Sequence, residues 1–440
     1  MKIIHIIPGS GGSFYCGNCL RDSKYFDALR KMGHDVIKVP MYLPIFSDEH
    51  DISDVPVFYG AISIYLKQLY PVFEKAPAWF DRLLNSKPML RLAASMAGST
   101  RAKGLEEMTI SMLEGEKGKQ HEELEKMTDW MRDHFKPDVV HLSNALLLGL
   151  AKRLKEKLQV PVVCTLQDED VWVDVMTDQS RKTVWNLMAE NSAHVDLFVS
   201  VSRYFAEVVM QKMSLSPEKI STIHIGVDPD DYIYRNVADK KRNIGYLSRM
   251  CHENGMDILA DAFILLKRLP GYEDVNLILT GGHTGDDKVF LKEIQKKINR
   301  NRLNEHVDFH KEFEGEGRRK FFEKTTLLCV PVRNGEAFGI YIAESMASGI
   351  PVVQPALGAF PEIIQKTGGG IIYKENTPEA LMSALKQLLD NPDQLRRLSD
   401  DARKGAEMYL NINELAKELV GVYEELANNM PSLRTPVPTV

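Results

Sequence analysis

Residues 334–353 constrain the fold of this chain more than any other stretch. They follow an apolar run at 327–332, which predicts a short strand buried on both faces, as in a parallel sheet. A helix is predicted from about 338 to 348, because Gly349 stands where a left-handed residue ends a helix and Pro351 stops its continuation. A strand, a helix and a second strand in this order predict an α/β fold.

The N-terminus of this helix predicts a site for an anion. Backbone amides near Ala337, Phe338 and Gly339 point outward there, and the helix end carries about half a positive charge. Glu336 lies in the turn, and Glu344 on the helix leans back toward the same end. Two carboxylates repel a bare phosphate but accept hydrogen bonds from hydroxyl groups that flank one, which favours a nucleotide-sugar. The alternative is that both glutamates are solvated surface acids.

The glutamate pair, the aromatic–glycine step between its members and the trailing residues 349–353 resemble retaining glycosyltransferases of family four. The resemblance covers most of the chain and thins between about residues 47 and 126 and after about residue 425. It implies the GT-B fold, in which two Rossmann-like domains face a cleft and a C-terminal helix crosses back to the first domain. It also implies that Glu336 contacts the transferred sugar and that Glu344 contacts the nucleotide ribose.

Two domains are expected, because 440 residues are too many for one ordinary core. An acceptor domain is predicted over 1–225, with a helical insertion at about 60–130, and a nucleotide-sugar domain over 226–410. The returning helix is predicted at 411–428 and a flexible tail at 429–440.

Charge and composition exclude several classes of protein. The formal charge of −6 argues against a general nucleic-acid binder. No apolar run approaches the roughly 18 residues of a membrane-spanning helix, and residues 1–8 indicate a first strand rather than a signal peptide. Five cysteines, an odd number in a large chain, favour a reducing cytoplasm. Within the cytoplasm, the inner face of the membrane is the more specific alternative.

The N-terminal end predicts a strand–helix–strand unit with a glycine turn at residues 9–12 after its first strand. The glycine spacing does not match the dinucleotide-binding motif, which disfavours an NAD site. The family resemblance implies that Gly11 and Gly12 face the diphosphate and the acceptor. A simple tight turn is the alternative.

Cys16 and Cys19 form a CxxC motif at the start of the helix that follows. A helix N-terminus lowers the pKa of a thiol, so redox chemistry is one interpretation. A zinc site needs two more ligands, and the sequence has no second CxxC. We interpret the motif as packing and turn chemistry and leave any further role open.

Residues 65–96 carry apolar and aromatic side chains among scattered cations and predict one or two amphipathic helices. Three interpretations stay open for them: a subdomain that caps the core, a lid over the acceptor, and a peripheral contact with an anionic membrane. Residues 100–135 predict one long helix with a polar face.

The acceptor side is predicted near the end of a strand at 138–142, which contains His141. Ser143, followed by Asn144, stands where many members of the family carry a histidine or an acid, so a proton relay for the acceptor is not assigned. The acidic run at 167–170 resembles the metal-binding DXD motif of the other glycosyltransferase fold. A single acidic triplet is common by chance, and no metal is expected.

On the donor side, Arg249 matches an arginine that clamps the diphosphate in the family, and its planar fork suits phosphate oxygens. A surface ion pair is the alternative for Arg249. The family's second clamping residue is a lysine, and Asn254 stands in its place here. Three interpretations stay open: another cation substitutes for the lysine, Asn254 binds the diphosphate without a charge, or the protein is a weak catalyst. Gly282 ends the next strand in a turn, and Phe313 lies where relatives hold the base through backbone groups.

Together these features predict a transferase that moves a sugar from a nucleotide-diphosphate sugar to a hydroxyl of a glycan, a lipid-linked glycan or a small molecule. Retention of the anomeric configuration and independence from metal are expected, with no cofactor besides the donor. The family resemblance implies that the acceptor proton passes to a leaving phosphate oxygen. The alternatives are a GT-B nucleotide-sugar 2-epimerase and a catalytically weak paralogue that binds a nucleotide-sugar. The sugar, the base, the acceptor and the oligomeric state are not specified by the sequence.

Overall fold

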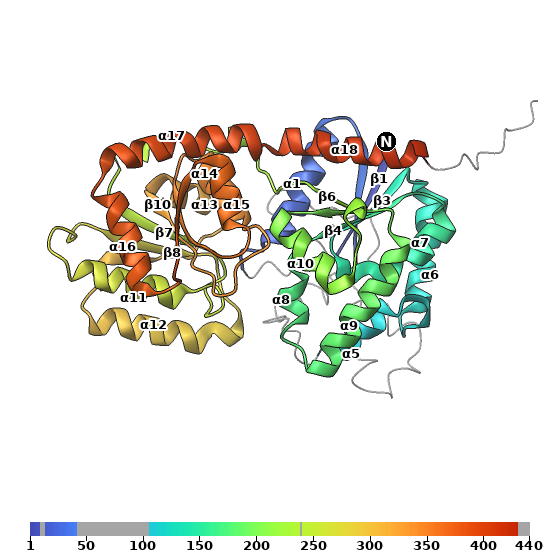
Figure 1. Ribbon diagram of the computed structural model, residues 1–440, viewed down its shortest axis with the longest axis horizontal. Helices are drawn as coiled ribbons and strands as arrows, with labels where there is room; N and C mark the ends of the chain where they lie inside the picture. Colours follow the sequence, from blue (N-terminus) through green and yellow to red (C-terminus); the bar gives the residue numbers. More distant parts are fainter. Residues whose placement is uncertain (9–13, 42–104, 238–239, 430–440) are drawn as a thin grey trace, which may run out of the picture.

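The computed structural model describes residues 1–8, 14–41, 105–237 and 240–429. Figure 1 shows two lobes side by side, each built on a sheet with helices packed around it. The glycine turn at 9–12 and the segment 65–96 lie outside the described residues, and so do the expectations that depend on them.

The first lobe contains a sheet of six parallel strands in the order β2-β1-β3-β4-β5-β6. Its central strands β3 and β4 are buried at every residue, as expected where helices cover both faces of a parallel sheet. The strands are β1 Lys2–Ile7, β2 Asp35–Pro40, β3 Val139–Leu142, β4 Val162–Leu166, β5 Leu197–Ser200 and β6 Ile220–Thr222. The helices are α1 Gly17–Lys31, α5 Glu106–Leu113, α6 His121–Trp130, α7 Ala151–Leu158, α8 Glu169–Val173, α9 Asp178–Asn191 and α10 Arg203–Met213.

The second lobe repeats this design with six parallel strands in the order β12-β11-β10-β7-β8-β9. In both sheets the strand order reverses direction at the first strand of the lobe, as in doubly wound nucleotide-binding folds. The strands are β7 Asn243–Leu247, β8 Asn276–Thr280, β9 Val307–Phe309, β10 Leu327–Leu328, β11 Val352–Pro355 and β12 Gly370–Tyr373. The helices are α11 Met256–Lys267, α12 Lys288–Arg300, α13 Gly315–Lys324, α14 Ile340–Ala347, α15 Phe360–Thr367 and α16 Pro378–Leu389.

Two long helices, α17 (Pro392–Tyr409) and α18 (Ile412–Asn429), join the lobes along one edge of the molecule in Figure 1. α17 packs on α14 and α15 in the second lobe, and α18 packs on α1 in the first. Leu419 and Tyr423 of α18 share a hydrophobic cluster with Ile3 of β1. The predicted helix that crosses back to the first lobe is therefore confirmed, and so are the two Rossmann-like sheets.

One detail of the expected secondary structure was wrong. The segment predicted as one helix at 100–135 is, from residue 105, divided into α5, a short 3-10 turn, α6 and a π-helical turn. A Cβ on Gly115 would lie 2.3 Å from the carbonyl oxygen of Gly149, so this close approach requires glycine and turns the chain. β6 ends at Thr222 and β7 begins at Asn243, and the residue at which one domain passes into the next stays a prediction.

Loops at the carboxyl ends of strands from both sheets meet between the lobes. Tyr15, which follows β1, donates its amide to the Gly281 carbonyl after β8 at 2.8 Å. Asp168 and Ser202, which follow β4 and β5, both contact Ala337 after β10. Ligands of open α/β sheets bind at this end of the strands, so the interface is where a site is expected.

Candidate active site

The turn between β10 and α14 carries the predicted donor residues. Gly335 has φ +81°, and a Cβ there would lie 2.6 Å from the Gly358 amide nitrogen. Gly339 has φ +84°, and its Cβ would lie 3.2 Å from Oε2 of Glu336. Both positions need glycine, since left-handed backbone and close neighbours exclude a side chain. The left-handed Gly339 is also the N-cap of α14, which explains why the helix starts at Ile340 rather than near residue 338.

One backbone amide of this turn has a hydrogen-bond acceptor among the described residues, and two have none. The Ala337 N–H donates to Oδ1 of Asp168 at 3.1 Å. Within the described residues, the amides of Phe338 and Gly339 have no hydrogen-bond acceptor. An amide that lacks a protein acceptor beside a helix N-terminus is a donor for an anion or a hydroxyl.

Glu336 lies at the interface, half-buried, and accepts a hydrogen bond from the Tyr341 hydroxyl at 2.5 Å. Burial, and after it the charge of Asp168, raise the pKa of Glu336 above its usual range. The neutral carboxyl is thereby favoured, and a neutral carboxyl can donate a hydrogen bond as well as accept one.

Asp168 is the residue that sequence reasoning missed. It comes from the first lobe, and its backbone has the left-handed conformation (φ +56°) that few residues other than glycine, asparagine and aspartate adopt. Burial raises the pKa of its carboxyl, and its charge acts on Glu336 across the interface. The signal for Asp168 in the sequence is the acidic run at 167–170, for which the sequence alone offers only a resemblance to a metal-binding motif.

The rest of that acidic run does not form a metal site. Glu169 turns inward, where its carboxylate accepts the amides of Ala145 and Gln167 at 2.8 and 2.9 Å. No group of three or more histidine, cysteine or acidic side chains in the described part of the chain is arranged to hold a metal ion.

Glu344 is fully buried at the same interface, at 0% exposure. Its carboxylate accepts the hydroxyl of Tyr15 from the first lobe at 2.5 Å and that of Tyr232 at 2.7 Å. Arg318 Nε lies 3.3 Å from the same carboxylate. Protein groups therefore surround Glu344, and a pocket shared by Glu336 and Glu344 stays a prediction.

Arg249 follows β7 and lies beside the first lobe. Its guanidinium donates to both oxygens of Asp287 at 2.9 Å and to Thr284 at 3.0 Å. The ring of Phe14 stacks against it, with the guanidinium carbon 5.6 Å from the ring centroid. Phe14 also forms an antiparallel bridge to Gly282, so these donor-side residues are held by the segment that precedes α1.

Asn254 is occupied by the turn in which it lies. Its side-chain amide donates to Ser248 Oγ at 2.8 Å and to the Arg249 carbonyl at 3.3 Å. The guanidinium of Arg333 lies against the same loop, since its Nε donates to the His252 carbonyl at 3.0 Å. Its Nη2 pairs with Asp257 at 2.5 Å.

The predicted acceptor residues lie in the core or serve as caps. The two ring nitrogens of His141 contact the hydroxyls of Tyr423 on α18 and Thr165 on β4, and the residue is 2% exposed. Ser143 is buried and donates to Asp22 at 2.6 Å. Asn144 caps a 3-10 turn at 145–150. The expectation that this strand end supplies acceptor contacts is corrected for His141 and Ser143, whose polar atoms are already used inside the lobe.

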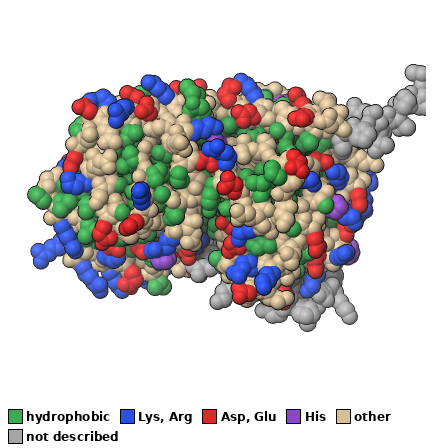
Figure 2. Space-filling model, viewed as in Figure 1, with side chains coloured by type: hydrophobic (Ala, Val, Ile, Leu, Met, Phe, Trp, Pro, Cys, Tyr) green, Lys and Arg blue, Asp and Glu red, His purple; other side chains and the backbone are tan. Residues whose placement is uncertain are grey.

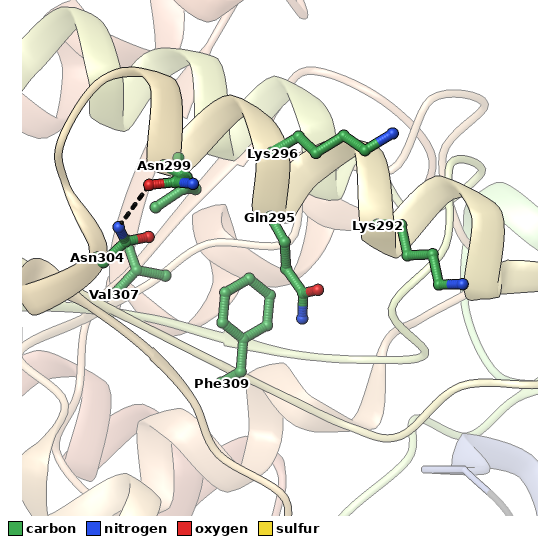
Figure 3. A pocket seen from close by; sticks show the side chains of 8 residues that line it. Lys292, Gln295, Lys296, Asn299, Asn304, Val307 and Phe309 are labelled. Carbon is green, nitrogen blue, oxygen red and sulfur yellow. Dashed lines mark hydrogen bonds between the residues drawn. The ribbon is translucent and has the colours of Figure 1, made fainter.

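Phe313 and a cavity beside α12 both belong to the second lobe. Phe313 packs half-buried at the start of α13. A cavity of about 520 Å³ lies between α12 and β9, lined by residues that include Lys292, Gln295 and Phe309 (Figure 3). On the face drawn in Figure 2, basic and acidic side chains are interspersed over both lobes. In the described ranges, no helix is long and apolar enough to cross a membrane.

Two facing Rossmann-like sheets, a connecting pair of helices and polar groups gathered between the strand ends define the GT-B class of glycosyltransferases. The family described as Glycosyl transferases group 1 matches residues 233–405, and Glycosyltransferase Family 4 matches residues 113–231. The two matched regions follow one another along the chain, and the chain belongs to the glycosyltransferases that these two families describe.

Individual relatives agree with this assignment. The lipopolysaccharide core biosynthesis mannosyltransferase LpsB of Rhizobium meliloti is 28% identical over 190 residues, which cover 42% of this chain and 52% of the relative. The match thus spans about half the length of that relative. The MMP alpha-(1->4)-mannosyltransferase of Mycolicibacterium hassiacum is 26% identical over 301 residues, 66% of this chain and 70% of the relative. HepE of Anabaena, solved in complex with UDP, superposes with a TM-score of 0.67 at 15% identity and covers 97% of this chain and 100% of HepE. At that identity the likeness concerns the fold alone.

Proposed function

We propose that the protein transfers a sugar from a nucleoside-diphosphate sugar to a hydroxyl acceptor, with retention of the anomeric configuration and without a metal ion. The observation that carries this proposal is the pair Glu336 and Asp168, which meet across the interface beside amides that have no acceptor in the described chain. A carboxyl on each side of one reacting centre suits a donor sugar on one lobe and an acceptor on the other. Mannosyltransferases among the relatives and UDP in HepE support a nucleotide-sugar donor.

The donor is held mainly by the second lobe. The amides of Phe338 and Gly339 and the guanidinium of Arg249 stabilise charge on the departing diphosphate, and one such donor contributes roughly 100-fold or more to the rate. Glu336, whose pKa burial raises to about 8, can release and take up a proton while it exchanges hydrogen bonds with the sugar hydroxyls. At Glu344, the Tyr15 hydroxyl marks the place that a ribose hydroxyl takes, so the nucleotide displaces Tyr15 when it binds.

The acceptor is held by the first lobe, with Asp168 as the carboxylate that receives the attacking hydroxyl. The bond from the anomeric carbon to the diphosphate oxygen breaks while the bond to the acceptor oxygen forms on the same face of the sugar. The hydroxyl proton passes to an oxygen of the leaving diphosphate. Asp168 orients the hydroxyl and does not keep the proton.

Arg333 replaces the lysine that the family uses beside the diphosphate, because its guanidinium lies against the loop that contains Asn254. A charge-assisted hydrogen bond contributes about 1.5–3 kcal/mol. We expect Arg333→Ala to weaken nucleotide-diphosphate binding by roughly tenfold. Calorimetry with the matched variant Arg396→Ala, an exposed arginine on α17, is the control. Equal affinities for both variants would mean that a residue other than Arg333 supplies the charge of the family's lysine.

A thermal-shift screen with UDP-, GDP- and ADP-sugars tests the donor class, because a ligand that binds the folded state raises the melting temperature. NMR of the product made from the stabilising donor then reports the anomeric configuration. Absence of any stabilisation, or an inverted product, would contradict the proposal. Release of a changed sugar without an acceptor product would indicate the 2-epimerase instead.

A further inference from the structure

Cys16 and Cys19, the CxxC motif, contact each other at the start of α1. The proposed reaction does not use them. Cys16 is the N-cap of this helix, and its Sγ accepts the amide of Cys19 at 3.4 Å. Both residues are partly exposed, whereas Cys164, Cys251 and Cys329 are buried. All five are present as thiols.

The two groups of cysteines differ in their electrostatic surroundings. The hydrogen bonds from Cys19, first from its side chain and then from its amide, hold the pKa of Cys16 below its usual range in spite of burial. Burial raises the pKa of Cys164 and Cys329, and raises that of Cys251 to about 12. The thiolate is the reactive form of cysteine, so Cys16 is the one poised for exchange with a disulfide.

The dithiol lies beside the interface between the lobes. Tyr15, its immediate neighbour, donates its hydroxyl to Glu344 and its amide to Gly281, both in the second lobe. A Cβ on Gly17 would be 3.4 Å from the side chain of Ile340, the first residue of α14. A movement of the first turn of α1 therefore reaches the proposed nucleotide site directly.

We propose that Cys16 and Cys19 form a reversible intramolecular disulfide, and that its formation changes nucleotide affinity by moving Tyr15. A disulfide joins its two Sγ atoms at about 2 Å, whereas Sγ of Cys16 now caps the helix as the acceptor of the Cys19 amide at 3.4 Å. Closing the bond tightens the first turn and shifts the adjacent Tyr15 relative to Glu344. The effect on affinity rests on the proposed function, and the disulfide itself does not.

A low-molecular-weight disulfide such as oxidised glutathione is the oxidant. The Cys16 thiolate attacks one of its sulfurs, its S–S bond breaks, and one glutathione thiolate leaves and takes up a proton. Cys19 then loses its proton and attacks Sγ of Cys16, which releases the second glutathione. Two protein thiols are oxidised and one disulfide is reduced to two thiols, so electrons and atoms balance.

Mass spectrometry tests the first half of the proposal. The protein is equilibrated with reduced and oxidised glutathione, quenched in acid, alkylated and then digested. We expect one disulfide that links Cys16 to Cys19, while the three buried cysteines are alkylated only after unfolding. Cys16→Ser and Cys19→Ser should abolish it, and serine in place of Cys16 still caps the helix, so the melting temperature should stay nearly unchanged. Complete alkylation of both thiols after excess oxidised glutathione would overturn the proposal.

Calorimetry of the oxidised and reduced protein with UDP, GDP and ADP tests the second half. We expect the dissociation constant of the binding nucleotide to differ by roughly threefold or more between the two forms, and not to respond to glutathione in Cys19→Ser. Equal constants in both forms would overturn control through Tyr15. If neither form binds any of the three nucleotides, the proposed function fails, while the alkylation result still decides whether the disulfide exists.

Discussion

The proposed donor half and the proposed acceptor half of this site differ in how their residues are brought together. On the donor side, Glu336, Gly339 and Glu344 lie within nine residues of one another in the sequence, and one turn and one helix position all three. On the acceptor side, His141 and Ser143 point into the core, and Asp168 from a different loop meets Glu336 instead. The residues of a site that lies within one supersecondary unit can be predicted from its sequence motif. Those of a site assembled from several loops cannot.

The buried polar cluster of the first lobe shows what the acceptor candidates do. Arg21 donates to Asp22 and Thr165 at 2.8 and 2.7 Å, and His141 joins Thr165 to Tyr423 of α18. Burial lowers the pKa of His141, which therefore stays neutral. These groups hydrogen-bond to one another inside one lobe, while Glu336 and Asp168 meet between lobes beside amides that lack an acceptor in the described chain. The first arrangement stabilises a fold, and the second can receive a substrate.

Glu336→Gln is the strongest test of the donor half. The amide keeps the shape and can still accept the hydrogen bond from Tyr341, but it loses the ionisable carboxyl. We expect the transfer rate to fall by roughly 100- to 1000-fold with little change in melting temperature. Initial rates with the donor found by thermal shift measure it, and Glu375→Gln, an exposed glutamate of the same lobe, is the matched control. Near-normal turnover would sink the assignment of Glu336.

Asp168→Asn tests the acceptor half in the same way. Asparagine tolerates the left-handed backbone and can still accept the Ala337 amide, so only the charge is removed. We expect transfer to the acceptor to fall roughly 10- to 100-fold with unchanged nucleotide affinity.

The pH dependence of Asp168 separates charge from structure. Its pKa is raised, so in the wild type the rate should fall as pH drops through a value above that of an ordinary aspartate, because the charged form is lost. This acidic limb should be missing in Asp168→Asn and present in Asp178→Asn, the control, which changes an exposed aspartate of the same lobe. A limb that persists in Asp168→Asn would assign it to another group.

Glu362→Gln tests whether the lobes are held together by groups outside the reacting centre. Glu362 on α15 accepts the first two amides of α10, from Arg203 and Tyr204, both at 3.1 Å, and pairs with His224 at 2.9 Å. Although burial raises its pKa, the hydrogen bonds from His224 and these amides hold it at about 2.

The folded-state pKa of Glu362 is depressed, so its contribution to stability is present above the ordinary glutamate pKa and is lost as pH falls toward about 2. We expect Glu362→Gln to lower the free energy of unfolding by about 1–3 kcal/mol at pH 7. The difference from the wild type should shrink on acidification. Urea unfolding at pH 7 and at pH 3 measures both, and an equal difference at the two values would exclude the charge as its cause.

Tyr423→Phe gives the smallest expected effect and tests the structural side of the comparison. The change removes the hydroxyl that contacts His141 but keeps the ring, so we expect a loss of about 1 kcal/mol in unfolding free energy. The transfer rate and the acceptor KM should not change. A large loss of activity at unchanged stability would mean that the His141 cluster takes part in the reaction after all.

The sequence alone predicts the α/β class, the two sheets and the returning helix, which are confirmed, and it puts Glu336 and Glu344 on one turn and the helix that follows. These follow from hydrophobic runs, glycine and proline signals and short spacings, all of which act within a few residues. The contacts of Asp168 with Glu336, of Tyr15 and Tyr232 with Glu344, and of His141 with α18 become visible only in the folded protein. Each of these contacts joins residues more than a hundred positions apart or in different lobes. The pairing there is set by how two folded lobes fit together, and local sequence carries no signal for that fit.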